Sequence, residues 1–134
     1  MVATMLLISF QMYSQEATLK IKVFNIQKNT GKIVVEIYNN KSTWLETPLR
    51  KVLLNTNEAA KTASFDVPFG NYAVSVYHDV NGNGELDRNF IGIPKEPIGF
   101  GNNYKPFGKP KYKSAIIEYK ATGKPQEIKL IEAF

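Results

Sequence analysis

The 134-residue chain is predicted to form an all-β protein, a seven-stranded antiparallel β-sandwich with one long ordered loop over residues 79–113. Three observations support this class. Short segments with alternating apolar and polar residues recur along the chain, turn-forming residues separate them, and no long stretch has helical periodicity. A succession of short strands favours two packed antiparallel sheets.

The amino terminus, residues 1–15, is expected to be a secretory signal peptide, because an apolar run at 5–10 precedes small and polar residues. No lysine or arginine precedes Lys20, so this leader is either truncated or unusual. The alternative is a first strand or a buried helix. The run is too short to span a bilayer, and no transmembrane segment is expected. Residues 16–134 are then a single domain.

Seven segments have the alternation or the β-branched composition of strands. They are 18–26, 31–38, 49–55, 62–67, 72–78, 114–121 and 125–131. The first two are separated by turn residues and are expected to pair as a hairpin. Trp44 lies in the loop after the second strand, where we expect it to cover the core rather than to bind a ligand.

The connection over residues 79–113 contains no recognisable strand or helix. Loops of this length are uncommon in compact domains unless they are functional or disordered. Apolar residues recur throughout this one, so we expect it to pack down as an ordered flap. A bound cation would be the simplest way to fix its backbone.

The first nine residues of this connection have the spacing of the front half of a calcium-binding EF-hand loop. The candidate metal ligands are Asp79, Asn81, Asn83, Glu85 and Asp87. The twelfth position, however, is Phe90 instead of a bidentate glutamate, so this is not an EF-hand. Any Ca²⁺ site would be weak, at about 10⁻⁴–10⁻³ M, and would need further ligands. The alternative is a turn whose side chains bond to their own backbone.

The remaining ligand-binding candidates are His78, Asn89, Glu96, Asn102 and Asn103. One histidine without cysteine disfavours a structural zinc site. His78, Asp79 and Glu96 could serve a small hydrolase that uses a metal or water, but neighbouring strand residues such as His78 and Asp79 point to opposite faces. An enzyme would gather the three side chains in one concave pocket, whereas a structural loop would bond them to backbone.

The charge balance, 17 basic against 12 acidic residues, gives a net charge of +5. The lysines are spread over many segments with no basic run, so a solvated surface is favoured over nucleic-acid binding. The chain has no cysteine, which excludes disulfides and thiol chemistry.

The stretch YAVSVYHDVNGNGELDRNFIGIPKEPIGFGNN, at 72–103, resembles the signature of domain-of-unknown-function family 2141, which comprises small exported bacterial proteins. Gly101 stands where that family often has serine. The resemblance implies export to the periplasm or the cell exterior, and an immunoglobulin-like or prealbumin-like sandwich. It implies no activity. We therefore expect a non-enzymatic binding or accessory module of the cell envelope, with a glycan, peptide or envelope component as its ligand.

Overall fold

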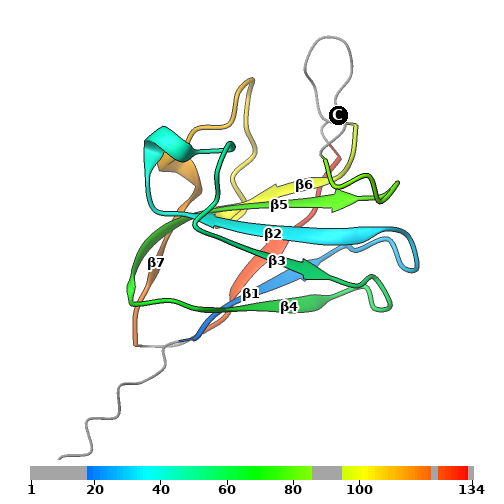
Figure 1. Cartoon of the computed structure of the whole chain (residues 1–134), viewed down its shortest axis with the longest axis horizontal. Helices are drawn as coiled ribbons and strands as arrows, with labels where there is room; N and C mark the ends of the chain where they lie inside the picture. The colour runs from blue at the N-terminus through cyan, green and yellow to red at the C-terminus, as the bar shows by residue number, and fades with distance from the viewer. Residues whose placement is uncertain (1–17, 86–94, 122–123, 133–134) are drawn as a thin grey trace, which may run out of the picture.

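The computed structural model describes residues 18–85, 95–121 and 124–132, and within these ranges the chain is all-β (Figure 1). Eight strands are described. They are β1 (Thr18–Phe24), β2 (Lys32–Tyr38), β3 (Arg50–Leu54), β4 (Lys61–Asp66), β5 (Gly70–Asp79), β6 (Ile98–Phe100), β7 (Ile116–Tyr119) and β8 (Gln126–Lys129). Three short 3-10 turns accompany them, η1 (Lys41–Thr43), η2 (Gly101–Asn103) and η3 (Lys113–Ala115). No described segment is a helix long and apolar enough to cross a membrane.

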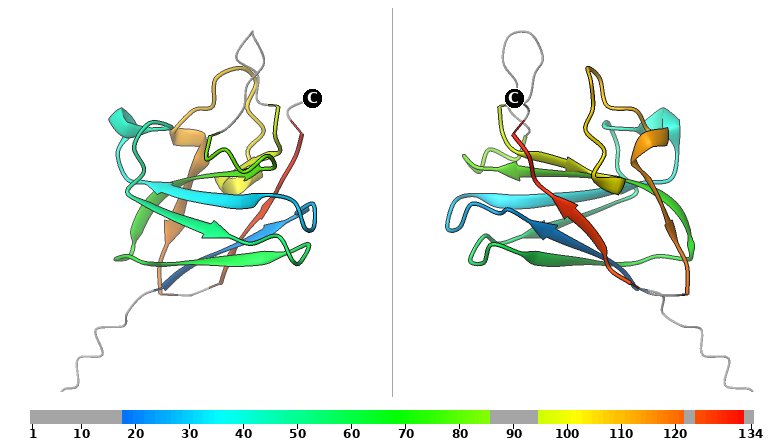
Figure 2. Two further views of the ribbon diagram at one scale, coloured as in Figure 1. Left: turned by 45° about the vertical axis from the view of Figure 1, so that its right-hand side comes forward. Right: turned by 180° about the vertical axis from the view of Figure 1, so that it is seen from behind.

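The strands form two stacked sheets, which Figure 2 shows from an oblique angle and from behind. One sheet has the order β4-β1-β8, and the other has the order β3-β2-β5-β6. Strand β7 pairs with the first half of β5, and β6 pairs with the second half of the same edge. All pairings are antiparallel except that of β1 with β8, which is parallel.

The main core lies between the two sheets and follows the alternation of the strands. In β1, the side chains of Leu19, Ile21 and Val23 point into this core, while those of Lys20 and Lys22 lie on the other face. The facing side chains of the five-stranded sheet come from alternate positions of β2 and β5. The all-β, two-sheet prediction is therefore confirmed.

A second apolar cluster covers the outer face of the five-stranded sheet. Its buried members are Val34, Tyr38, Ala73, Tyr77, Ile98, Phe100 and Ala115. Trp44 covers this cluster: its ring makes an edge contact with Tyr38 at 4.9 Å between centroids, and its Nε1 donates to the carbonyl oxygen of Pro110 at 3.0 Å. The outer face is thus covered over β2, β5 and β6. Residues 96–101 and the side chains of Tyr104 and Tyr112 pack on the sheet as expected, whereas Phe107, in the same connection, is fully exposed.

Two details of the predicted topology were wrong. Strands β1 and β2 do not form a hairpin, because β1 pairs with β4 and β8, whereas β2 pairs with β3 and β5. The physical reason is burial: β1 has a lysine face that needs solvent, whereas β2 is buried on both faces and needs a covered sheet. The strand count was also one short, since β6 lies inside the connection that was expected to contain no strand.

Candidate functional site

The candidate site lies where β5 ends and the long connection begins. The base of this loop is closed by backbone and side-chain bonds between residues far apart in sequence. The amide of His78 donates to the carbonyl oxygen of Pro97 at 2.9 Å, and the amide of Val80 donates to Oε2 of Glu96 at 2.6 Å. Glu96 is only 6% exposed. The two ends of the segment 80–96 are therefore held side by side.

Asp79 organises the turn that follows β5. Its carboxylate accepts two backbone amides, from Asn83 to Oδ1 at 3.2 Å and from Gly84 to Oδ2 at 2.7 Å. The amide of Asn83 also donates to Oδ1 of Asn81 at 3.2 Å, and the amide of Glu85 donates to Oδ1 of Asn83 at 3.0 Å. The oxygens predicted as metal ligands thus accept hydrogen bonds from their own loop.

His78 is fully buried and lies opposite Ile33 in the ladder of β2 and β5. Its Nε2 lies 2.6 Å from the carbonyl oxygen of Thr30. A carbonyl oxygen can only accept, so Nε2 carries the proton in this contact. Among the described residues, Nδ1 has no hydrogen-bond partner. The ring therefore joins β5 to the turn before β2.

The close approach of that turn to β5 depends on Gly31. This glycine has a positive φ of 58°, and a Cβ at this position would overlap the carbonyl oxygen of Asp79. Sequence reasoning identified the turn but assigned no role to Thr30 or Gly31. No local signal could have done so, because their partners lie almost fifty residues away.

Several carboxylates lie near Tyr77 on the outer side of the loop base. Burial, and then the charges of nearby carboxylates, raises the pKa of Tyr77 to about 12. The carboxylates are those of Glu36, Asp79, Glu96 and Glu85. The hydroxyl of Tyr77 also lies 3.5 Å from the carbonyl oxygen of Gly84. Tyr77 was not predicted as a site residue, although it lies two residues before Asp79 and therefore on the same face of β5.

Asn102 and Asn103 connect the end of the loop to both sheets. Both have the left-handed backbone, with φ of 64° and 53°. Asn102 donates through Nδ2 to the carbonyl oxygens of Ser114 and Ile116. Asn103 accepts the amide of Lys129 at 2.9 Å and donates to the carbonyl oxygen of Glu127 at 3.3 Å, so its side chain extends the ladder of β8.

Gly101, where serine was the residue anticipated from the resemblance, packs against backbone. A Cβ there would overlap the carbonyl oxygen of Ala115. In this chain, only glycine fits at the position without a clash, because η2 and η3 lie in direct contact.

The structure therefore brings Asp79, Glu96 and Tyr77 together, whereas strand alternation places His78 on the opposite face, towards the main core. Asp87 and Asn89 lie outside the described residues. Within the described ranges, no three or more His, Cys, Asp or Glu side chains gather closely enough to hold a metal ion.

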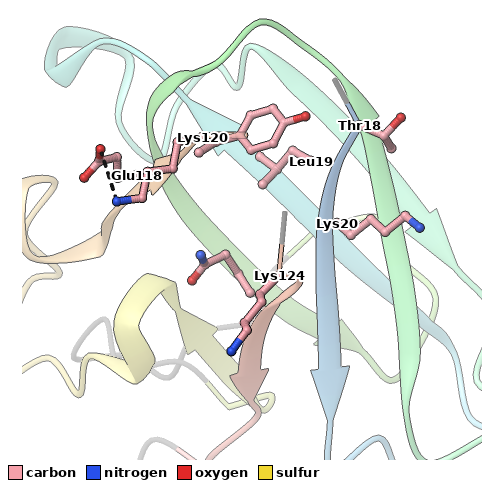
Figure 3. Close-up of a pocket in the computed structure, with 8 residues that line it drawn as sticks. Thr18, Leu19, Lys20, Glu118, Lys120 and Lys124 are labelled. Carbon is pink, nitrogen blue, oxygen red and sulfur yellow. Dashed lines mark ion pairs between the residues drawn. The ribbon is translucent and has the colours of Figure 1, made fainter. Parts of the chain in front are cut away.

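A cavity of about 210 Å³ lies elsewhere, where the start of β1, the end of β7 and the start of β8 meet (Figure 3). Three of its lining residues are lysines, and one of these, Lys120, pairs with Glu118 at 3.9 Å (Figure 3). Neither His78, Asp79 nor Glu96 lines it.

A family model described as "Uncharacterized protein conserved in bacteria (DUF2141)" matches residues 21–128. The match covers every strand from β2 to β7 and most of β1 and β8. No curated protein and no solved structure gives a significant match to the chain.

Proposed function

The chain belongs to this uncharacterised bacterial family, DUF2141, and we propose that it acts as a non-enzymatic binding or accessory module of the cell envelope. In this proposal the protein is exported, and a glycan, a peptide or an envelope component is its ligand. The described part of the long connection, which is anchored on the five-stranded sheet through Phe100, Tyr104 and Tyr112, forms the working face.

One observation carries the non-enzymatic part of the proposal: each of the three candidate catalytic side chains makes at least one hydrogen bond to backbone. Glu96 accepts the amide of Val80, Asp79 accepts two amides of its own turn, and His78 donates to Thr30. A general base must be within reach of a substrate proton. Here the imidazole faces the sandwich core and the carboxylates face the loop, which supports an architectural role.

The competing function is a small hydrolase that uses His78, Asp79 and Glu96. Chromogenic nitrophenyl acetate, nitrophenyl glycosides and bis-nitrophenyl phosphate test it directly. We expect rates equal to those of the heat-denatured protein. Turnover that requires the native fold and is abolished by Glu96→Gln would overturn the proposal, provided that the variant remains folded by circular dichroism.

We further propose that Ca²⁺ binds the turn that begins at Asp79. The spacing of the oxygens supports this, as does the sharing of one amide by Asp79 and Asn81, which holds two candidate ligand oxygens near each other. The carboxylates around Tyr77 add negative charge. Hard cations prefer such carboxylate and amide oxygens. Further ligands would have to come from backbone carbonyls or from Asp87, which lies outside the described residues.

The calcium proposal is tested by thermal unfolding in millimolar calcium chloride and in chelator. We expect calcium to raise the midpoint of the wild-type protein, because a ligand that binds only the folded state stabilises it. Magnesium is the matched control ion. The shift should be absent in Asn81→Ala, and equal midpoints with calcium and with chelator would remove the cation from the proposal.

A further inference from the structure

A second surface feature lies on the described part of the long connection, at the loop 105–111 between η2 and η3. At its tip the ring of Phe107 is 102% exposed, more than any other large apolar side chain that the structure describes. A single exposed apolar side chain is common on a folded protein and is not by itself evidence of a partner. The residues that accompany Phe107 therefore decide whether the tip is a contact surface.

Lysines flank this aromatic residue in the sequence. The segment KPFGKPKYK, at 105–113, carries four lysines and no acid, and all four side chains are exposed. They are Lys105, Lys109, Lys111 and Lys113. In the part of the chain that the structure describes, none of the four has an ion-pair partner. The loop thus carries an exposed aromatic side chain among four exposed lysines without ion-pair partners.

Both ends of the loop are fixed to the five-stranded sheet. On one side, the amide of Tyr104 donates to the carbonyl oxygen of Gly101, and the Tyr104 ring packs near Phe100. On the other side, Nε1 of Trp44 donates to the carbonyl oxygen of Pro110, and the Trp44 ring contacts the ring of Tyr112 at 5.8 Å between centroids. Figure 2 shows the loop standing out from the outer face of this sheet. The tip is therefore held away from the protein body.

We propose that the 105–111 loop docks the protein on an anionic lipid surface, with Phe107 inserted at the interface and the lysines against the headgroups. Interfacial binding strengthens with the apolar area that is buried and with attraction to anionic lipids. Each lysine close to such a surface contributes to binding. The inference rests on the proposed role as an envelope module, for which it names the partner.

Charge alone would also suit a soluble polyanion. The apolar ring at the tip distinguishes the two partners, because a polyanion in water offers no apolar phase in which to bury it. Lysines elsewhere on the chain, such as Lys20 and Lys124, line a cavity whose nearby exposed ring, Phe69, is only 46% exposed and packs against Tyr119. The combination at 105–111 favours the lipid surface.

The first test is co-sedimentation of the full chain with vesicles made of equal parts phosphatidylglycerol and phosphatidylcholine. Vesicles of phosphatidylcholine alone are the control, and we expect binding to the anionic vesicles only, weakened by added salt. Replacing Lys105, Lys109 and Lys111 together by Gln should lower the partition coefficient by at least about tenfold. The matched triple change at Lys20, Lys120 and Lys124 should lower it less than about threefold.

The apolar tip is tested separately. Phe107→Ser should weaken vesicle binding by about tenfold or more, since a buried phenyl ring contributes on that scale. Leu53→Ser is the matched control: Leu53 is 62% exposed on the edge strand β3 and should tolerate the change without loss of binding. The side chains of Lys105, Phe107, Lys109 and Lys111 all lie on the surface, and circular dichroism checks that the variants fold.

Insertion itself is measured with a polarity-sensitive dye on Phe107→Cys, which is the only thiol in that variant because the natural chain has no cysteine. We expect a blue shift with anionic vesicles, and none for the dye on Leu53→Cys. Equal losses from the two lysine triples, or full binding of Phe107→Ser to the anionic vesicles, would each overturn the inference. Soluble dextran sulfate is the control, and we expect wild type and Phe107→Ser to bind it equally because it offers the ring no apolar phase. A loss on dextran sulfate as large as the loss on vesicles would also overturn the inference. These results would not bear on the hydrolysis assays, so the two proposals fail separately.

Discussion

Glu96 accepts a hydrogen bond from the backbone amide of Val80 at 2.6 Å, and this bond joins two residues that are sixteen positions apart in the sequence. Beside this bond, Pro97 accepts the amide of His78, and β6 then continues the ladder along β5. The acidic and amide side chains at this end of the sandwich therefore close the base of a loop. This is the structural relationship on which the proposed role depends.

The first prediction concerns the contact of Gly31 with β5. Gly31→Ala should lower the free energy of unfolding by about 3 kcal/mol or more, because its Cβ would overlap the carbonyl oxygen of Asp79 and its φ is positive. Gly82→Ala is the matched control. Gly82 also has a positive φ, but no described atom lies within 4 Å of its Cβ position.

Urea unfolding followed by circular dichroism measures both glycine variants. Gly82→Ala should cost about 1 kcal/mol, from backbone strain alone. Equal costs at the two positions would show that the close approach of the turn to Asp79 does not contribute to stability.

The second prediction concerns alkaline pH. The pKa of Tyr77 is raised from 10.0 to about 12, so folding favours the protonated hydroxyl. The resulting stability is fully present below pH 10 and is lost as the pH rises towards 12. Unfolding measured across this range should show stability falling with pH. The fall should be shallower in Tyr77→Phe, and an identical slope in that variant would contradict the assignment.

The third prediction concerns Asn103, whose side chain pairs with the backbone of β8. Asn103→Gly keeps a residue that adopts positive φ easily but removes both side-chain bonds, so hydrogen exchange at the Lys129 amide should speed up. The global cost should be about 1–2 kcal/mol. Asn103→Asp retains the acceptor for Lys129 and loses the donor to Glu127, so it should protect the Lys129 amide better than glycine does.

NMR-detected exchange at the Lys129 amide distinguishes these outcomes. Unchanged protection in Asn103→Gly would mean that the side chain does not hold β8, and Asn103 would then be available as the ligand-binding residue suggested by the sequence.

Much of the fold could be predicted because strand alternation is a local property. The pattern of β1 correctly predicts that Leu19, Ile21 and Val23 face the core. Pairing is not local, and turn residues between β1 and β2 misleadingly suggested a hairpin. Strand β6 was missed because it is only three residues long and contains Gly99, a poor strand former. That glycine is needed where β8 crosses, since a Cβ would lie 2.6 Å from Ile128 Cγ2.

The candidate site shows the same limit. The spacing of Asp79, Asn81 and Asn83 correctly indicated a turn rich in side-chain oxygens, and that spacing is equally compatible with a cation or with backbone amides. Which partner the oxygens take depends on the path of the chain. The contacts of His78 with Thr30 and of Glu96 with Val80 depend on tertiary structure alone.

The most direct measurement is the free energy of unfolding of Asp79→Ala and Glu96→Ala, determined in urea at neutral pH without added calcium. If these carboxylates hold the loop, each variant should lose about 1–3 kcal/mol, since each leaves loop amides without their acceptor. Glu85→Ala, an exposed carboxylate of the same loop, is the control and should change stability by less than about 0.5 kcal/mol. Losses at Asp79 and Glu96 no larger than that of the control would contradict the architectural role.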